Sequence, residues 1–238
     1  MVRLPRLYAI LDAGFLPDTA GLLAATEELA AAGCTLIQYR NKSGNARVML
    51  EQGRDLKKCL THPNVAKNAT SGWGTQSQSS HFWQKRPEVG RPHAQSSVQL
   101  IMNDRADLCL AAEFDGVHVG QDDLSPESVR RIIGPDRWLG VSTHNPAQLR
   151  EADLTSADYL AIGPVFATSS KDKPDPVVGL EGVRRARALT RKPLVAIGGI
   201  TRANAASVIA AGADSVAVIS DLLRDPRKSA EEFLRILR

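Results

Sequence analysis

The chain has few cysteines and no long hydrophobic run, and each shortage excludes a class of protein. Its three cysteines (Cys34, Cys59 and Cys109) form no Cys-x-x-Cys pair, so we expect free thiols in a reducing cytoplasm rather than a disulfide framework. No apolar run approaches the ~20 residues that cross a bilayer, which argues against a membrane partner. Asp12 interrupts the first apolar run, "LYAIL", so this run indicates a first strand rather than a signal peptide.

The positive charge is not arranged as nucleic-acid-binding proteins arrange theirs. The net charge is +4. Residues 61–98 contain four basic residues and one acid, which is +3, so the rest of the chain carries only +1. No basic patch or stripe results, and we expect no nucleic-acid partner. A small excess of positive charge also fits a small anionic substrate.

Short apolar runs alternate with helix-like stretches along the chain. Runs that are nearly continuous in Val, Ile, Leu and Ala are typical of parallel strands buried on both faces. Eight such runs predict one α/β domain over 1–238, a (β/α)8 TIM barrel. A doubly wound eight-stranded sheet is the alternative, and the lack of a G-x-G-x-x-G turn after the first run disfavours it. The runs are 7–11, 34–40, 98–103, 116–120, 138–143, 159–166, 194–199 and 215–220.

Residues 61–98 break this rhythm. The segment is rich in Ser, Gln, Asn, Gly and Pro, and we interpret it as a long, irregular, low-complexity insertion between the second helix and the third strand. It could be a plain disordered insertion, a partner-binding loop, or a metal site made from His62, His81 and His93. Because it enters beside the start of a strand, we expect it to leave the barrel mouth open.

Carboxylates follow two consecutive predicted strands. Asp104 comes directly after the third strand, and Asp123 follows the fourth. Active sites of (β/α)8 barrels lie at the C-terminal ends of the strands, so the two acids should converge there. They would repel each other without a cation between them, and Mg²⁺, which prefers oxygen ligands, is the expected cofactor. The simpler alternative for Asp104 is the N-cap of the next helix.

Basic and hydroxyl groups stand at other predicted strand ends. Arg40, Lys42 and Lys171 can neutralise a polyanion, and arginine can bind two oxygens at once. The loops after strands seven and eight commonly form a phosphate site in barrels, which points to Gly199 and Ser220. These groups together predict a diphosphate near the metal and a separate monophosphate, hence small phosphorylated substrates. His118, inside "GVHVG", is expected to be a buried supporting histidine rather than a general base.

The motifs "QYRNK", "NDRADL", "GVHVGQDDL", "GVSTHN", "GPVFATSSK", "AIGGI" and "GADSVAVIS" resemble, in order and position, those of thiamine-phosphate synthases. The resemblance spans nearly all of 7–237 outside the insertion. It implies a (β/α)8 transferase that joins 4-amino-2-methyl-5-(diphosphooxymethyl)pyrimidine to 4-methyl-5-(2-phosphooxyethyl)thiazole, with release of diphosphate. It also implies that no protein nucleophile is needed, which agrees with the absence of a Ser-His-Asp or Cys-His pattern.

The same resemblance implies a division of the site residues among three groups. Asp104 and Asp123 would ligate Mg²⁺, and Arg40, Lys42 and Lys171 would act on the leaving group. The thiazole phosphate would be held by Thr168, Ser169, Ser170, Gly199, Ile219 and Ser220. The pyrimidine diphosphate would be held by Gln38, Tyr39, Arg40, Asn41, Lys42, Asn103, Ser142 and Lys171.

Three positions depart from the usual family pattern, and several rivals remain. Asn41 replaces a glutamate, Ser170 replaces a threonine, and Asp221 stands where a small residue is usual, beside the expected thiazole phosphate. The rival interpretations are a thiazole tautomerase-like barrel, a non-catalytic ligand-binding regulator, and a phosphosugar isomerase or aldolase. None of them needs paired carboxylates beside three cations. A homo-oligomer is compatible with the sequence, which does not set the oligomeric state.

Overall fold

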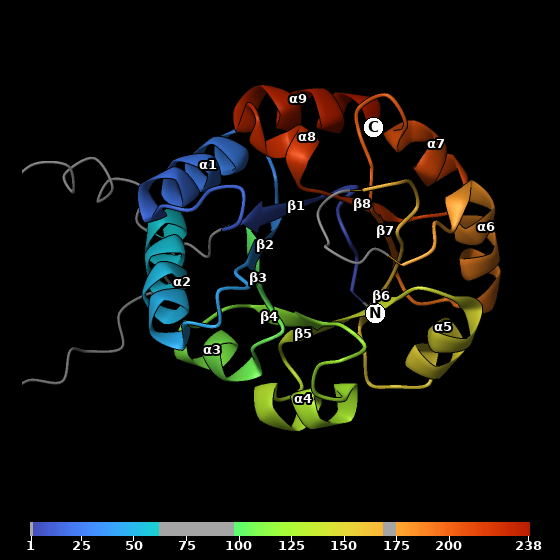
Figure 1. Ribbon diagram of the computed structural model, residues 1–238, viewed down its shortest axis with the longest axis horizontal. Coiled ribbons are helices and arrows are strands. Elements are labelled where there is room, and N and C mark those ends of the chain that lie inside the picture. Colours follow the sequence, from blue (N-terminus) through green and yellow to red (C-terminus); the bar gives the residue numbers. More distant parts are fainter. Residues whose placement is uncertain (1, 62–97, 169–174) are drawn as a thin grey trace, which may run out of the picture.

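The computed structural model describes residues 2–61, 98–168 and 175–238. Eight parallel strands form a closed barrel in which each strand pairs with its sequence neighbours and β8 pairs with β1 (Figure 1). This confirms the predicted (β/α)8 TIM barrel. The strands are β1 (Leu7–Asp12), β2 (Leu36–Arg40), β3 (Gln99–Asn103), β4 (Gly116–Val119), β5 (Trp138–Thr143), β6 (Tyr159–Ile162), β7 (Leu194–Ile197) and β8 (Ser215–Val218).

Helices surround the barrel and cover the outer face of its sheet (Figure 1). Within the described ranges, no helix is long and apolar enough to cross a membrane. The helices are α1 (Thr19–Ala31), α2 (Ala46–Thr61), α3 (Ala106–Ala111), α4 (Pro126–Ile133), α5 (Pro146–Asp153), α6 (Gly179–Leu189), α7 (Ala205–Ala210), α8 (Ser220–Leu223) and α9 (Pro226–Ile236).

Alternation along each strand divides the apolar residues into two cores. Successive side chains of a strand point to opposite faces, so every second residue points into the barrel. The larger core lies between the sheet and the helices. The smaller one fills the barrel interior and consists of Tyr8, Ile10, Leu36, Ile101, Tyr159, Ala161, Val195 and Ala217. Side chains therefore fill the barrel interior, and a ligand can bind only at one of its ends.

Local signals set where several helices and strands begin and end. Ser125 caps α4 by accepting a hydrogen bond from the Ser128 backbone N–H. The run predicted over 159–166 ends as a strand at Ile162, because Pro164 has no N–H to donate to a neighbouring strand. The run predicted over 215–220 ends at Val218, and Ser220 already opens α8.

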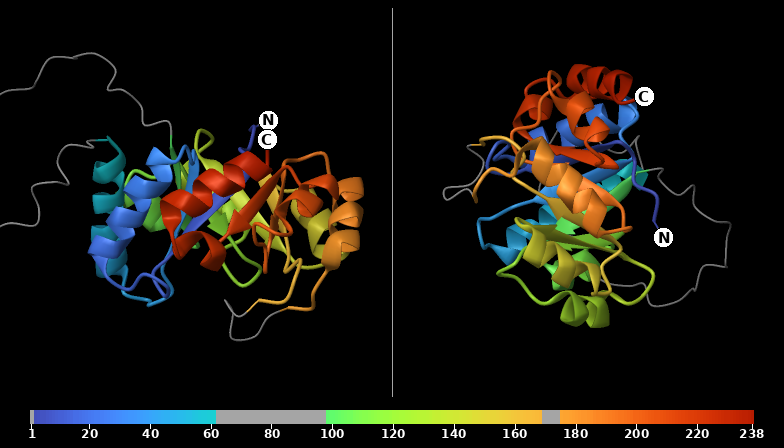
Figure 2. Two further views of the ribbon diagram at one scale, coloured as in Figure 1. Left: turned by 90° about the horizontal axis from the view of Figure 1, so that it is seen from above. Right: turned by 90° about the vertical axis from the view of Figure 1, so that its right-hand side faces the viewer.

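The boundaries of residues 62–97 lie at the N-terminal end of the barrel. Thr61 ends α2, and Val98 immediately precedes β3. Both are therefore at the end of the barrel opposite Asp104, which follows β3. The two chain ends lie on this same side (Figure 2). The proposed histidine metal site and the other expectations for the insertion lie outside the described residues.

The three cysteines are free, as predicted, and all three are buried. Burial raises the pKa of each thiol to about 12. Because the thiolate is the reactive form, these cysteines behave as small core residues.

Candidate active site at the C-terminal ends of the strands

Strand alternation brings several predicted site residues into the barrel interior from different strands. Gln38 and Arg40 follow the inward series of β2, and Asn103 ends the inward series of β3. The register pairs Asn103 with His118 on β4, and Ser142 on β5 continues the inward series of Gly140. Positions that are far apart in the sequence therefore share one end of the barrel.

The predicted carboxylate pair is present and lies beside a lysine. Lys42 Nζ forms an ion pair with Asp104 Oδ2. The pKa of Asp104 is raised, chiefly by burial and further by the neighbouring Asp123 carboxyl, although the hydrogen bond from Lys42 acts in the opposite direction. Asp123 is held by the Gly120 backbone N–H, which donates to Oδ2 at 2.7 Å. Asp123 is thus close enough to disfavour the charged form of Asp104.

Asp104 adopts a backbone conformation that residues other than glycine rarely adopt. Its φ is +62°, and its N–H donates to the His118 carbonyl at 2.8 Å. Asp and Asn tolerate this left-handed region better than most residues. The N-cap of α3 is Arg105, which makes no side-chain capping bond. Helix capping, the simpler explanation for Asp104, is therefore not what places it here.

These acids fit the chemistry of a magnesium site. Mg²⁺ is usually bound by one or two protein carboxylates and completes its octahedron with water and substrate phosphates. Among the described residues, no group of three or more His, Cys, Asp or Glu side chains could hold a metal by itself. Asp104 and Asp123 would therefore hold such an ion together with oxygens from a ligand. A cation between them would also relieve the repulsion that raises the pKa of Asp104.

Arg40 has an acidic partner that the sequence analysis overlooked. Its Nη1 forms an ion pair with Asp12 Oδ2, in an environment where both side chains are mostly buried. The β1–β2 register places the two residues opposite each other. Asp12 also accepts the Gly14 backbone N–H at 2.8 Å. Its position at the end of a buried strand was the available signal, since such an acid needs a partner.

Asn103 carries an unpaired donor. The residue is 8% exposed, and its Nδ2 has no hydrogen-bond partner among the described residues. A buried donor without a partner is rare in native proteins because its desolvation is uncompensated. The donor fits a ligand atom at the barrel mouth.

Tyr39 and Asn41 point away from this cluster. The Tyr39 ring is fully buried, and its hydroxyl donates to Gln52 Oε1 of α2 at 2.5 Å. Asn41 Nδ2 donates to both the Tyr39 hydroxyl and Gln52 Oε1, each at 3.0 Å. Strand alternation explains the outward direction of Tyr39. Its side chain therefore supports the loop after β2, and a ligand contact from Tyr39 would have to come from its backbone.

The loop after β7 is tightly packed against the loop after β6 at Gly199. Its φ is +61°, and an added Cβ would lie 2.5 Å from the Ala167 carbonyl oxygen, so only glycine fits. Ile219 is partly buried against the interior core, and Ser220 is exposed at the start of α8. Thr168 is half-buried in the loop after β6. Ser169, Ser170 and Lys171 lie outside the described residues.

Asp221 does not present an unpaired charge to this region. Its carboxylate accepts hydrogen bonds from the Arg202 backbone N–H at 2.9 Å and from the Arg202 guanidinium. Burial acts to raise the pKa of Asp221, but the Arg202 contacts outweigh it and leave the pKa lowered. Arg202 thus compensates the acid that departs from the family pattern.

His118 is buried under the mouth, as expected. Its Nε2 lies 2.8 Å from Ser142 Oγ, and its Nδ1 lies 3.1 Å from the Tyr159 hydroxyl. Burial lowers the pKa of His118 to about 4, against the opposing effect of Asp123. The imidazole is therefore neutral near pH 7. Tyr159, which contacts His118, and Tyr8, which contacts Tyr159, did not stand out in the sequence, although a tyrosine in a buried strand needs a partner for its hydroxyl.

The fold and the site define a (β/α)8-barrel enzyme with its site at the C-terminal ends of the strands. A family model described as thiamine monophosphate synthase matches residues 76–222. The thiamine-phosphate synthase of Koribacter versatilis is 54% identical over 239 residues, which cover 99% of this chain and 97% of that protein. The chain therefore belongs to the thiamine monophosphate synthase family, and it is a transferase.

Two further relatives agree with this. The thiamine-phosphate synthase of Chloroflexus aurantiacus is 38% identical over 98% of this chain and 92% of its own length. The solved structure of thiamine phosphate pyrophosphorylase from Pyrococcus furiosus is 29% identical, with a TM-score of 0.74 over 98% of this chain and 95% of that one. These names support the synthase interpretation over the tautomerase-like barrel.

Proposed function

We propose that this enzyme joins 4-amino-2-methyl-5-(diphosphooxymethyl)pyrimidine to 4-methyl-5-(2-phosphooxyethyl)thiazole to give thiamine phosphate and diphosphate. The observation that carries the proposal is the meeting of two mutually repelling carboxylates, Asp104 and Asp123, with Lys42 at one barrel mouth. The curated names of the relatives, thiamine-phosphate synthase, support the same product.

The residues of the chain act on the leaving group. In the proposed reaction the carbon–oxygen bond to diphosphate breaks with its electron pair on oxygen, and a bond from the thiazole nitrogen to that carbon forms. Arg40, Lys42 and Lys171 stabilise the negative charge that grows on the departing diphosphate. Lys42 can turn from Asp104 to a phosphate because its side chain is 55% exposed. Mg²⁺ held by Asp104 and Asp123 would supply Lewis-acid stabilisation of the same charge.

Other residues bind and orient the two substrates. Gln38, Asn103 and Ser142 border the barrel interior and would hold the pyrimidine ring. The loop residues Thr168, Ser169, Ser170, Gly199, Ile219 and Ser220 would hold the thiazole phosphate, so that its ring nitrogen is placed for attack. The aminopyrimidine ring spreads the positive charge of the reacting carbon, so no nucleophile from the protein is required.

An assay of the purified protein tests the proposal. Thiamine phosphate and diphosphate should form in equal amounts when both phosphorylated substrates and Mg²⁺ are present. Omission of either substrate, or chelation of the metal, should stop formation of both products. Diphosphate release from the pyrimidine alone at the full rate, or no product with all components present, would contradict the proposal.

A further inference from the structure

A continuous chain of hydrogen bonds crosses the barrel interior beneath the mouth. Its two ends, Gln38 and Ser142, belong to the proposed pyrimidine site, and three buried side chains connect them. Gln38 Nε2 donates to the Tyr8 hydroxyl at 2.9 Å, and that hydroxyl lies 2.9 Å from the Tyr159 hydroxyl. The Tyr159 hydroxyl lies 3.1 Å from His118 Nδ1, and His118 Nε2 lies 2.8 Å from Ser142 Oγ.

The barrel architecture itself holds this chain of hydrogen bonds in place. Tyr8 and Tyr159 are 1% and 0% exposed, and strand register sets Gly140 between His118 and Tyr159. A Cβ at Gly140 would lie 2.4 Å from His118 Nδ1 and 2.2 Å from the Tyr159 ring. The missing side chain therefore makes room for the bond between these two residues.

The number of available protons sets the direction of donation along this chain of hydrogen bonds. Because Gln38 donates to Tyr8, the Tyr8 hydroxyl proton is directed to Tyr159. Tyr159 then donates to His118 Nδ1, and the neutral imidazole carries its one proton on Nε2 and donates it to Ser142 Oγ. The Ser142 hydroxyl proton is left for a ligand. At the other end no described residue donates a hydrogen bond to Gln38 Oε1, so this acceptor is also left for a ligand.

We propose that Tyr8, Tyr159 and His118 are positioning residues that fix Gln38 Oε1 as an acceptor and the Ser142 hydroxyl as a donor, so that the site selects a 4-aminopyrimidine over its 4-oxo counterpart. This inference rests on the proposed function. The amino group donates to Gln38 Oε1, and ring nitrogens accept from Ser142 and from the unpaired Asn103 Nδ2. A 4-oxo ring offers an acceptor and an N–H in place of this pattern, so like groups would face each other.

Reversal of the chain requires several changes at once. The Gln38 amide would have to flip, both tyrosine hydroxyls would have to rotate, and His118 would have to move its proton to Nδ1. Any one change alone sets two donors or two acceptors against each other in a buried site, where an unmade hydrogen bond is costly. The buried part of the chain thereby opposes accommodation of the 4-oxo ring.

The His118 tautomer tests the direction without any substrate. We expect ¹⁵N NMR of the labelled protein to show His118 with its proton on Nε2, with His118→Asn used to assign the signal. Tyr8→Phe disconnects Gln38 from the rest of the chain, so it should shift part of the population toward the Nδ1–H tautomer. A wild-type protein with its proton on Nδ1 would overturn the proposed direction.

Substrate discrimination tests the consequence. The ratio of kcat/KM for the 4-amino substrate to that for the 4-oxo analogue should fall at least about ten-fold in Tyr8→Phe and in Tyr159→Phe. The loss for the amino substrate should lie mainly in KM, because the bonds affected hold the ring before and during the reaction. Thr143→Val is the matched control, since its buried hydroxyl on β5 donates to the Ala161 carbonyl at 2.7 Å outside the chain.

The outcomes separate the inference from the function on which it rests. An unchanged ratio in both tyrosine variants, in proteins that fold and couple the 4-amino substrate, overturns the specificity role and leaves the proposed function intact. An equal fall in Thr143→Val also overturns it, because any buried hydroxyl would then do the same. A wild-type protein that couples neither pyrimidine overturns both proposals together.

Discussion

The two ends of the barrel use the same residue type, an aspartate beside a strand end, in opposite ways. At the N-terminal end, Asp115, Asp158 and Asp214 each directly precede a strand, β4, β6 and β8. Each accepts the backbone N–H of the preceding strand's Leu100, Leu139 or Leu194 at 2.8 Å. Each is also paired with a cation from a helix, namely Lys57, Arg130 and Arg187, at 3.0, 2.6 and 2.8 Å.

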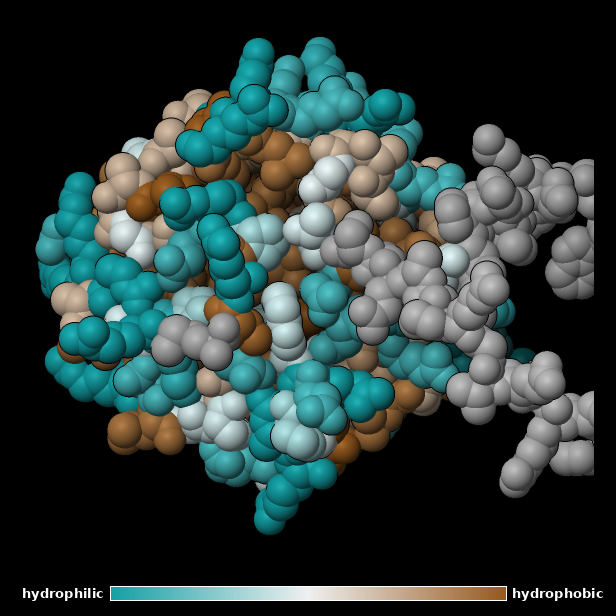
Figure 3. All heavy atoms as spheres, turned by 180° about the vertical axis from the view of Figure 1, so that it is seen from behind, coloured by the Kyte–Doolittle hydropathy of each residue, from teal (hydrophilic) through white to brown (hydrophobic). Residues whose placement is uncertain are grey.

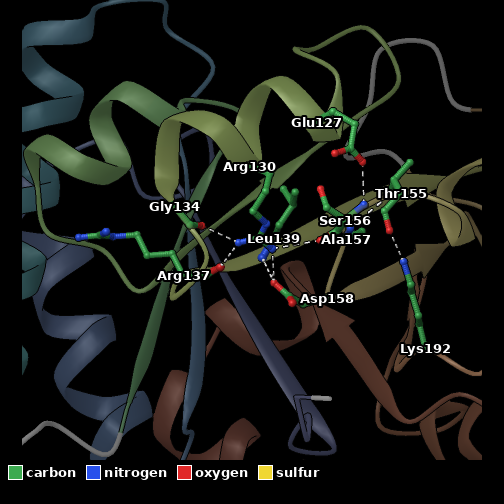
Figure 4. Close-up of polar contacts among 10 residues, drawn as sticks. All are labelled: Glu127, Arg130, Gly134, Arg137, Leu139, Thr155, Ser156, Ala157, Asp158 and Lys192. Carbon is green, nitrogen blue, oxygen red and sulfur yellow. Dashed lines mark hydrogen bonds and ion pairs between the residues drawn. The ribbon is translucent and has the colours of Figure 1, made fainter.

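Figure 4 shows one of these N-terminal clusters in detail. Arg130 reaches the Gly134, Arg137 and Ser156 carbonyls as well as Asp158, and Lys192 donates to the Thr155 carbonyl at 2.6 Å. On the visible part of this face, hydrophilic side chains are interspersed with hydrophobic ones (Figure 3). An open groove at this end is lined by five basic residues among others, namely Arg3, Arg6, Arg187, Arg191 and Lys192. Arg187 and Lys192 donate to backbone carbonyls, and the aspartate clusters hold strands together.

At the C-terminal end some polar groups are left unsatisfied or in conflict, although others, such as Arg40 and Asp12, are paired. Burial and the neighbouring Asp123 raise the pKa of Asp104, Asp104 has a left-handed backbone, and Asn103 has an unpaired donor among the described residues. Satisfied groups stabilise a fold, whereas unsatisfied groups at one end are available to a ligand. The comparison assigns stability to the N-terminal end and binding to the C-terminal end, as the (β/α)8 architecture generally does.

Matched Asp→Asn substitutions at the two ends should give the largest contrast. We expect Asp104→Asn to lower kcat/KM at least about 100-fold, because one of the two carboxylates that would hold the charge-stabilising Mg²⁺ is lost. Its unfolding free energy without metal should not fall: burial and Asp123 raise the pKa of Asp104, so the charged form is the less favourable one in the folded protein. Coupling kinetics and urea unfolding measure the two effects.

The partner variant, Asp158→Asn, should show the reverse. It leaves the mostly buried Arg130 guanidinium without its counter-charge, and we expect a loss of about 1–3 kcal/mol in unfolding free energy with kcat unchanged. If Asp158→Asn lowered kcat as strongly as Asp104→Asn, or if Asp104→Asn destabilised the fold as strongly as Asp158→Asn, the assignment of the two ends would be wrong.

The free energy of unfolding should depend on pH because the imidazole of His118 is buried beneath the barrel mouth. Burial lowers the pKa of His118 to about 4 from an ordinary 6.5. Between these values the unfolded chain binds the proton and the folded protein does not, so unfolding free energy falls as pH drops. The contribution is fully present above pH 6.5, and about 3 kcal/mol is lost by pH 4. Urea unfolding of the wild type and of His118→Asn over this range isolates it, and parallel curves would refute it.

Substitution of one lysine at each end of the barrel should give the smallest difference in stability and activity. Lys57 pairs with Asp115 and is mostly buried, whereas Lys42 pairs with Asp104 and is largely exposed. Lys57→Met should lower unfolding free energy by about 1 kcal/mol and leave kcat/KM unchanged. Lys42→Met should change stability by less than about 0.5 kcal/mol and reduce kcat/KM. Equal effects of the two variants on activity would contradict the division.

Much of the fold and part of the site could be predicted from the order of residues. Nearly continuous apolar runs with a polar residue at the strand end, as in "VQLIMND", are local features, and they located Asn103 and Asp104. The Arg40–Asp12 pair joins different strands, and the three N-terminal aspartates join strands to helices far along the chain. No local sequence pattern specifies which charged partner each side chain contacts, so these ion pairs could not be predicted.

Tyr39 illustrates the same limit in the opposite direction. The family resemblance implied a role shared with Gln38 and Arg40, but alternation sends the Tyr39 ring outward to Gln52 of α2. The Tyr8–Tyr159–His118 chain was likewise not predicted, because it depends on three strands and on the space at Gly140.

The sequence alone determined the strand and helix succession, the closed-barrel class, and which polar residues stand at strand ends, because these follow from local periodicity and chain order. Only the tertiary structure decided which of those residues face one another, which aspartates are paired and which conflict, and in which direction the buried hydrogen bonds run. These properties depend on the closure and register of the barrel, which brings together side chains up to about 150 positions apart (Tyr8 and Tyr159, |i−j| = 151).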